Sequence, residues 1–178
     1  MSAGLVLTSN SPPHQPTFQV VNSSNSNGYF SLNTPVIDVT GDGTTYTILY
    51  DTTNFQNGSD ISYNSGTGVF TINTTGVYNI ELFLSVRNLG VAHLQLQASL
   101  SLSTIGGPAI YANPYAMSNQ TTNQQASYGS SVTLSLTSTN TFKVIVQVSG
   151  STKTVTASGN TGSPNFNDSN YLSYSRVA

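Results

Sequence analysis

The chain has 178 residues, no cysteine and a formal charge of −2, and only 6% of its residues are charged. Four basic residues are too few for phosphate-driven nucleic-acid binding, and the lack of cysteine excludes disulfides and thiolate metal sites. No apolar run approaches the roughly 20 residues of a spanning helix, so we expect no membrane span, and the length suits one domain.

Residues 1–34 are rich in Ser, Asn, Pro and Gly, and we expect them to be an N-terminal linker that leads into the domain. The prolines of SNSPPHQP keep their neighbours extended, and Asn22–Gly28 (NSSNSNG) has the composition of a loop. Short strands are expected to flank this loop at Phe18–Val21 and Tyr29–Leu32. The folded domain is therefore assigned to residues 35–178.

From residue 35 onward, apolar and polar residues alternate with a period of two, which predicts β-strands. The predicted strands are PVIDV, TYTILYD, GVFTIN, GVYNIELFLSVR, VAHLQLQASLSL, PAIYANPY, SVTLSLT, TFKVIVQVSG, TKTVTAS and YLSYSRV. Helical periodicity is absent, and the polar run Ser118–Ser127 is expected to be a loop. About ten short antiparallel strands separated by turn residues indicate an all-β sandwich or jelly roll.

The alternation also assigns side chains to faces. One strand is expected to bury Tyr78, Ile80, Leu82, Leu84 and Val86 and to turn outward Asn79, Glu81, Phe83 and Ser85. The next is expected to bury Ala92, Leu94, Leu96, Ala98 and Leu100, opposite His93, Gln95, Gln97 and Ser99. A later strand is expected to bury Phe142, Val144, Val146 and Val148, opposite Lys143, Ile145 and Gln147.

Two glycine–aromatic units carry a resemblance to a known superfamily. The run Tyr63-x4-Gly68-x-Phe70-x5-Gly76-x-Tyr78-x-Ile80 resembles the signature of the globular complement component 1q and tumour necrosis factor superfamily, with Ile80 in place of phenylalanine. We expect the two glycines to relieve backbone strain where strands start, so that the aromatic rings enter the core.

Other segments extend this resemblance over residues 35–178. The stretch TGDGTTYTILYD resembles the early strands of microbial and viral members, and VAHLQLQASL, VIVQVSGSTKTV and YLSYSR look like their later strands. The end departs from the usual aromatic-Ser-Gly-x-Leu-Leu finish, because Ser173 replaces the glycine and Ser175 and Arg176 replace the leucines.

The resemblance implies a ten-stranded jelly roll that forms a homotrimer at the tip of a fibre, stalk or secreted oligomer. It implies an extracellular location, on a microbial cell or virion surface, and a cell-surface protein or glycan as receptor. A collagen-like or fibre stalk would lie upstream, since the chain has no Gly-X-Y repeat. The trimer-interface candidates are Asn79, Glu81, Phe83, Lys143, Ile145 and Gln147.

Glu81 would approach the threefold axis of such a trimer. Three buried carboxylates would need a basic partner, a cation or protonation, because unpaired buried charges are costly. Lys143 or Arg87 is a candidate partner across subunits, calcium or another axial ion is the alternative, and an ordinary solvated glutamate is the simplest interpretation. Asp42-Gly43 is interpreted as a β-turn pair, since its surroundings lack the acidic series of an EF-hand calcium loop.

Tyr111, Tyr115 and Tyr128 surround the polar run Ser118–Ser127 and are the ligand-binding candidates. Tyrosine combines an apolar ring with a hydrogen-bonding hydroxyl, which suits sugar or protein ligands. Packing in the core or between subunits is the alternative role for these three rings.

The sequence has no recognisable catalytic motif. His14 and His93 have no acidic or metal-ligating neighbour at a useful spacing, and no Gly-x-Ser-x-Gly elbow or recognisable carboxylate pair occurs. We therefore expect a non-enzymatic trimeric head domain, without a cofactor, that attaches to a receptor or glycan and/or caps a fibre. The alternatives are a purely structural trimerisation or capsid-decorating module and a secreted signalling ligand.

Overall fold

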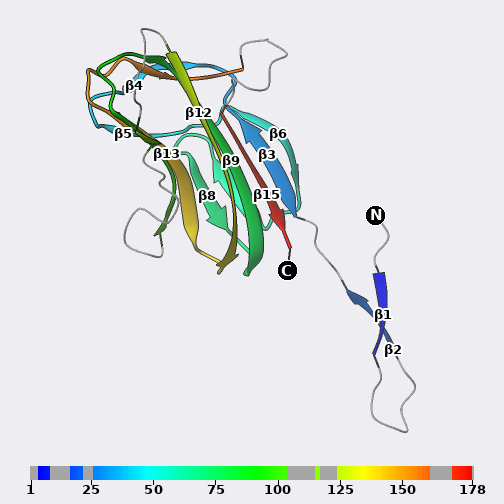
Figure 1. The fold of residues 1–178 in the computed structure, drawn as a ribbon. Coiled ribbons are helices and arrows are strands. Elements are labelled where there is room, and N and C mark those ends of the chain that lie inside the picture. Colours follow the sequence, from blue (N-terminus) through cyan, green and yellow to red (C-terminus); the bar gives the residue numbers. More distant parts are fainter. Residues whose placement is uncertain are drawn as a thin grey trace.

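The structure, a computed structural model, describes residues 4–8, 17–21, 26–103, 115–116, 124–160 and 170–177, and for 4–8, 17–21 and 115–116 it describes the backbone. These residues form β-strands and connecting turns (Figure 1). The strands are β1 (Gly4–Thr8), β2 (Thr17–Val21), β3 (Asn27–Ser31), β4 (Val36–Thr40), β5 (Thr45–Thr47), β6 (Thr52–Asn57), β7 (Ile61–Asn64), β8 (Val69–Ile72), β9 (Gly76–Leu89), β10 (Gln95–Leu102), β11 (Tyr115–Ala116), β12 (Gln124–Leu136), β13 (Thr141–Ser149), β14 (Val155–Ala157) and β15 (Tyr171–Arg176). In the described part of the chain, no helix has the length and apolar character of a membrane span.

Two antiparallel sheets form the sandwich, and β1 and β2 pair with each other. The six-stranded sheet has the order β11-β10-β13-β8-β7, with β5 also paired to β13. The seven-stranded sheet has the order β4-β14-β9-β15-β3-β6, with β12 also paired to β9. This arrangement confirms the predicted all-β jelly roll, with more strands than the ten expected.

The seven-stranded sheet includes residues that precede position 35. β3 pairs along one edge with β15 and along the other with β6. β2 and β3 correspond to the two short strands expected at Phe18–Val21 and Tyr29–Leu32. The segment assigned as a linker, 1–34, therefore contributes a strand to the sandwich.

The core lies between the two sheets and follows the alternation of β9, β10 and β13. The inward residues of β9 and β13, from Tyr78 to Val86 and from Phe142 to Val148, are buried as predicted. Burying one large apolar side chain contributes roughly 1.5–3 kcal/mol, so these two strands supply much of the folding free energy.

An aromatic cluster fills the core beside the glycine–aromatic units. Phe70 stacks on Phe142 with ring centroids 4.9 Å apart and on Tyr63 at 4.4 Å. Gly68 has a φ of 70°, and a Cβ there would lie 2.7 Å from Thr47 Cγ2, so only glycine suits this strand start. Gly76 starts β9, and Tyr78 and Ile80 are buried, while Tyr63 is half-buried against the cluster.

The start of β10 differs from the prediction. His93 is 3% exposed and Leu94 is 64% exposed, the reverse of the predicted faces. The reason is a turn at residues 90–94, in which the His93 N–H donates to the Gly90 carbonyl at 3.0 Å. A turn breaks the period of two, so the alternation holds only from Gln95 onward.

Residues 124–127 also differ from the prediction, because they belong to β12 and not to a loop. Gln124 pairs with Leu89, and Ala126 pairs with Val86. These residues form a strand because their backbones pair with β9 at the sheet edge. They lack the apolar alternation that usually identifies a strand in the sequence. The rest of the expected loop, 118–123, lies outside the described residues.

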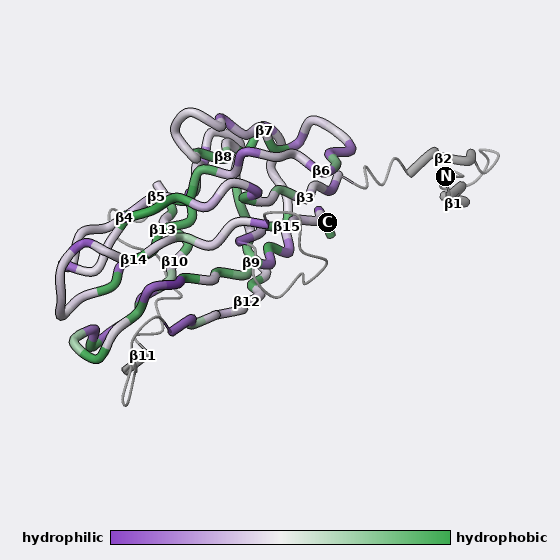
Figure 2. The backbone as a smooth tube through the Cα atoms, turned by 90° about the horizontal axis from the view of Figure 1, so that it is seen from above, coloured by the Kyte–Doolittle hydropathy of each residue, from purple (hydrophilic) through white to green (hydrophobic). Residues whose placement is uncertain are grey.

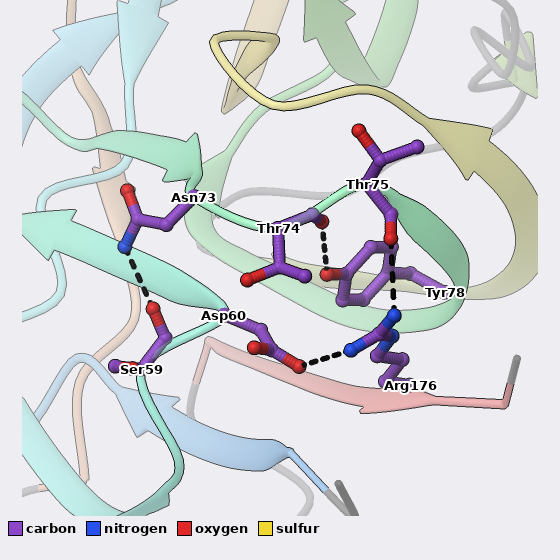
Figure 3. A network of polar contacts seen from close by, with 7 residues as sticks. All are labelled: Ser59, Asp60, Asn73, Thr74, Thr75, Tyr78 and Arg176. Carbon is purple, nitrogen blue, oxygen red and sulfur yellow. Dashed lines mark hydrogen bonds and ion pairs between the residues drawn. The ribbon is translucent and has the colours of Figure 1, made fainter. Parts of the chain in front are cut away.

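Arg176 joins several turns at one end of the sandwich (Figure 3). Its Nη1 forms an ion pair with Asp60 Oδ2 at 3.1 Å, and its Nη2 donates to the Thr75 carbonyl at 3.1 Å. Its backbone N–H donates to the Ser26 carbonyl at 2.8 Å, where the chain leads into β3. The Tyr78 hydroxyl donates nearby to the Thr74 carbonyl at 2.6 Å. We call these contacts of Arg176 the Arg176 clamp.

We predict that Arg176→Met lowers the free energy of unfolding by about 1–3 kcal/mol, because it leaves the largely buried Asp60 carboxylate without its charged partner. Arg176→Lys should lower the free energy of unfolding by a smaller amount, since lysine keeps the positive charge. Urea denaturation measures both. Lys153→Met, which removes an exposed charge, is the matched control, and an equal effect of the two methionine variants would contradict the clamp.

Asp51 ties the segment after β3 to the segment before β6. Its carboxylate accepts hydrogen bonds from the backbone N–H groups of Asn33 at 2.7 Å and Thr34 at 2.8 Å. Partial burial raises the pKa of Asp51, but the hydrogen bonds from Asn33, Thr34 and Thr52 together outweigh burial and leave the pKa below its ordinary value. The ionised carboxylate therefore stabilises the fold.

We predict that Asp51→Asn lowers the free energy of unfolding at neutral pH by about 1 kcal/mol, a value reduced for the exposure of this carboxylate. The pKa is lower in the folded state, so this stability is complete above the unfolded value of about 3.9 and is lost as pH falls through the folded pKa. Urea denaturation between pH 7 and pH 3 should show the two proteins converging at the acid end. A difference that stays constant with pH would contradict the assignment.

Candidate functional site

The outer face of the seven-stranded sheet carries a row of four aromatic rings from four neighbouring strands. They are Phe55 on β6, Tyr29 on β3, Tyr171 on β15 and Phe83 on β9, and we call them the aromatic row. The successive centroid distances are 6.2 Å, 5.5 Å and 5.5 Å, and the first and last pairs are stacked. Figure 1 shows the four strands side by side.

Strand pairing explains why these rings meet. Tyr29 lies directly opposite Phe55, and Tyr171 lies directly opposite Phe83. Tyr29 pairs with Ser173, which places it diagonally from Tyr171, within reach of a large side chain. The registers of these strand pairs therefore bring together rings from segments that are distant in sequence.

The row is apolar and incompletely covered. Phe55 is 52% exposed, and the other three rings are half-buried, mainly against one another. Burial raises the pKa of Tyr29, and burial together with the Glu81 charge raises that of Tyr171, so both hydroxyls remain neutral hydrogen-bonding groups. Contiguous apolar patches that are partly exposed on soluble proteins are frequent at interaction surfaces.

Residues with small side chains lie next to Phe83 on β12. Gly129 of β12 lies opposite Phe83, and a Cβ at Gly129 would already contact the Phe83 ring at 3.5 Å. Further along, Ser131 and Thr133 point outward and donate to the Asn79 amide oxygen at 3.2 Å and 3.3 Å. Small side chains here allow another backbone to approach the end of the row closely.

Glu81 lies beside the aromatic row on the same face. Its cross-strand neighbours are Ser131 on β12 and Ser173 on β15, and the Ser173 hydroxyl donates to Glu81 Oε2 at 3.5 Å. Glu81 is exposed, whereas Asn79 and Phe83 are half-buried. These three interface candidates therefore share one outward face.

The other three interface candidates lie on the opposite side of the sandwich. Lys143, Ile145 and Gln147 belong to β13 in the six-stranded sheet and are half-buried on its outer face. Lys143 can therefore reach Glu81 only from another subunit. Arg87 lies six residues further along β9 than Glu81, roughly 20 Å away.

Metal-ligating side chains are sparse. Within the described ranges, no group of three His, Cys, Asp or Glu residues could hold a metal ion. Glu81 has serine hydroxyls as its cross-strand neighbours, so one protomer offers an ion a single carboxylate. An axial ion would need copies of Glu81 from other subunits.

Of the three tyrosines proposed for ligand binding, the structure describes the side chain of Tyr128 alone. Tyr128 faces inward from β12, is half-buried and packs against the core, which agrees with the packing alternative. Tyr115 lies in β11 opposite Leu96, and Tyr111 lies outside the described residues.

Sequence reasoning missed most of the aromatic row. Tyr29 fell within the assigned linker, Phe55 belonged to no predicted strand, and only Phe83 was named as an interface candidate. The available signal is an aromatic residue in each strand, Phe55 in Thr52–Asn57 and Tyr171 at the start of Tyr171–Arg176, but it does not say which strands are neighbours.

Comparison with known proteins identifies the fold. No family model and no curated protein matches the sequence. The crystal structure of murine APRIL at pH 8.0 matches 86% of this chain and 99% of its own, at 10% identity and a TM-score of 0.56. The Eiger TNF of S. frugiperda matches 86% and 94% respectively, at 14% identity and a TM-score of 0.60.

The globular domain of zebrafish complement 1qA matches 86% of this chain and 98% of its own, at 13% identity and a TM-score of 0.50. The fold is that of the tumour necrosis factor and complement 1q jelly rolls. Identities this low show the shared fold alone. The seven-stranded sheet and its aromatic row must therefore be interpreted from this chain's own residues.

Proposed function

We propose that this chain is a non-enzymatic, homotrimeric head domain whose trimer interface includes the aromatic row. It is extracellular, on a microbial cell or virion surface, where it attaches to a receptor or glycan and/or caps a fibre or collagen-like stalk. The aromatic row is the observation that carries the proposal, since four adjacent rings in one strip are partly exposed in the protomer.

Assembly would cover this apolar strip. Aromatic rings are enriched in the buried centres of protein interfaces, and rings already stacked in the protomer lose little side-chain entropy on binding. The lack of a side chain at Gly129 gives a second subunit room to approach Phe83. A contact in which the row meets a different surface of the next subunit forms a closed ring when its rotation closes, and a threefold rotation gives a trimer.

A trimer also supports attachment. Three copies of a weak site, presented together, bind a surface with an avidity that exceeds the affinity of one site. A purely structural trimerisation or capsid-decorating module would use the same interface. A secreted signalling ligand is a further, less favoured alternative.

We predict that light scattering gives a mass three times the 18.7 kDa of the chain. Phe55→Ser and Phe83→Ser should each weaken the trimer at least tenfold, because they remove apolar contact from the row, with the circular dichroism spectrum retained. Val177→Ser is the matched control, since Val177 is 58% exposed and Phe55 is 52% exposed. A monomer, or equal loss in all three variants, would overturn the proposed assembly.

The Glu81→Gln variant tests whether Glu81 lies near the threefold axis of the proposed trimer. If three Glu81 carboxylates face one another, Glu81→Gln should change the midpoint of trimer dissociation and remove its response to pH and to chelator. The physical reason is that a neutral amide needs neither a cation nor a basic partner. Asp42→Asn, on an exposed turn, should leave the dissociation unchanged. A variant that keeps the wild-type response would show that Glu81 is an ordinary solvated residue.

A further inference from the structure

A cavity of about 450 Å³ opens at the end of the sandwich opposite the Arg176 clamp. β9 connects the two ends, since Tyr78 lies at the clamp and Asn88 lies at the cavity, roughly 33 Å apart along the strand. We call this cavity the tip pocket. It is lined by Asp38, Asn88, Leu89, Gly90, His93, Ser151 and Thr154.

Two β-bulges shape the tip pocket. Between the pairs Val36–Ala157 and Thr40–Val155, β4 has three residues where β14 has one, which gives a bulge at Asp38. β9 has a second irregularity at Asn88, opposite β12. Bulges of this kind redirect side chains and are frequent beside binding sites.

Both bulges hold strained backbone. Asp38 has a φ of 53° and Asn88 a φ of 61°, and only Thr139 among the other described non-glycine residues also has a positive φ. Asp and Asn adopt this left-handed region more readily than other non-glycine residues, and such conformations are enriched at functional sites. Two of the three strained residues thus line one pocket.

The walls of the tip pocket are held together by backbone contacts. The Ser151 N–H donates to the Gly41 carbonyl at 2.9 Å, and the Leu94 N–H donates to the Ser149 carbonyl at 2.9 Å. A Cβ at Gly150 would lie 2.5 Å from the Ala92 carbonyl oxygen, so the two loops are in close contact. The pocket is therefore preformed, as ligand sites usually are.

His93 supplies a buried donor at this site. Its Nδ1 accepts a hydrogen bond from the Gly90 N–H at 2.8 Å, which places the proton of the neutral ring on Nε2. Nε2 is buried and has no hydrogen-bond partner among the described residues. A buried polar atom without a partner is uncommon. Nε2 lies next to Gly41, since a Cβ at Gly41 would be 3.1 Å from it.

The remaining lining groups are mainly acceptors and hydroxyls. Asp38 is the only charged lining residue, and the Asn88 amide nitrogen donates to Thr156 Oγ1 at 2.9 Å, which leaves its amide oxygen as an acceptor. Ser151 and Thr154 supply hydroxyls, and Leu89 supplies an apolar wall. Lys153 lies between them in sequence but does not line the pocket.

Exposed aliphatic side chains lie beside these polar groups. Ile37 is 70% exposed next to Asp38, and Val91 and Leu94, in the turn that contains Gly90 and His93, are 75% and 64% exposed. Figure 2 shows hydrophobic residues in this turn at the end of β9. The tip thus combines a polar pocket with an apolar rim.

We propose that the tip pocket binds a neutral sugar residue of a glycan. Sugar hydroxyls both donate and accept, which matches the carboxylate, amide oxygen and hydroxyls of the lining, and the apolar face of the ring matches the aliphatic rim. Asp38 repels anionic sugars, and one carboxylate is too few for a divalent cation. This inference rests on the proposed attachment function and gives it a site and a ligand class.

The test titrates the whole chain with methyl glycosides of neutral hexoses and N-acetylhexosamines, followed by nuclear magnetic resonance. We expect millimolar binding that shifts the resonances of Leu89 and His93, with no binding of N-acetylneuraminic acid. Asp38→Asn should weaken binding at least tenfold, and asparagine tolerates the positive φ. Asp42→Asn, which changes the net charge equally outside the pocket, should bind as the wild type does.

Three results would overturn the inference: no neutral glycoside shifts the pocket resonances, Asp38→Asn binds with wild-type affinity, or calcium chloride or a lysine-containing peptide binds the pocket and the glycosides do not. The wild-type shift map keeps the test decisive even if Asp38→Asn fails to fold. Light scattering on the same samples separates the two proposals. A trimer that binds no sugar removes only the pocket inference, whereas a monomer that binds sugar removes only the proposed assembly.

Discussion

The position of β9 constrains both faces of this molecule at once. β9 pairs with β12, β14 and β15, so its register sets that of three other strands. One alternate set of its side chains, including Tyr78 and Leu84, fills the core, and the other includes Glu81 and Phe83. A slip of one residue would exchange these sets, burying a carboxylate and exposing the core residues. The same pairing that buries the core therefore also aligns the aromatic row.

Local alternation predicted β9 and β13 well because both strands have one fully buried face. It failed where another interaction sets the conformation. β6 was missed because most of its residues are exposed at a sheet edge, and β12 starts in a polar run because backbone pairing holds it. His93 is buried by a turn, which has no period of two. The aromatic row and the tip pocket depend on which strands are neighbours and on bulges, and neither is encoded in a local pattern.

The scarcity of charge gives each charged residue a distinct structural setting. Arg176 pairs with Asp60, and Asp51 accepts two backbone N–H groups. Glu81 and Asp38 differ, since both are exposed on surfaces otherwise formed by hydroxyls, amides and apolar groups. A lone carboxylate in such a setting is weakly screened by neighbouring charges, so it selects partners more strongly than one within a mixed-charge surface.

The placement of the Arg176 clamp has a mechanical consequence. The chain leads into β3 at Ser26 and leaves β15 at Arg176, and these two points are joined by a hydrogen bond at one end of antiparallel neighbours. A force that pulls these two points apart would open β3 from β15 one hydrogen bond at a time. A force between this end and the tip pocket would instead load β3, β9 and β15 along their length, so that many hydrogen bonds resist together. A head held at the clamp end and loaded at the tip is thus pulled in its mechanically strong direction.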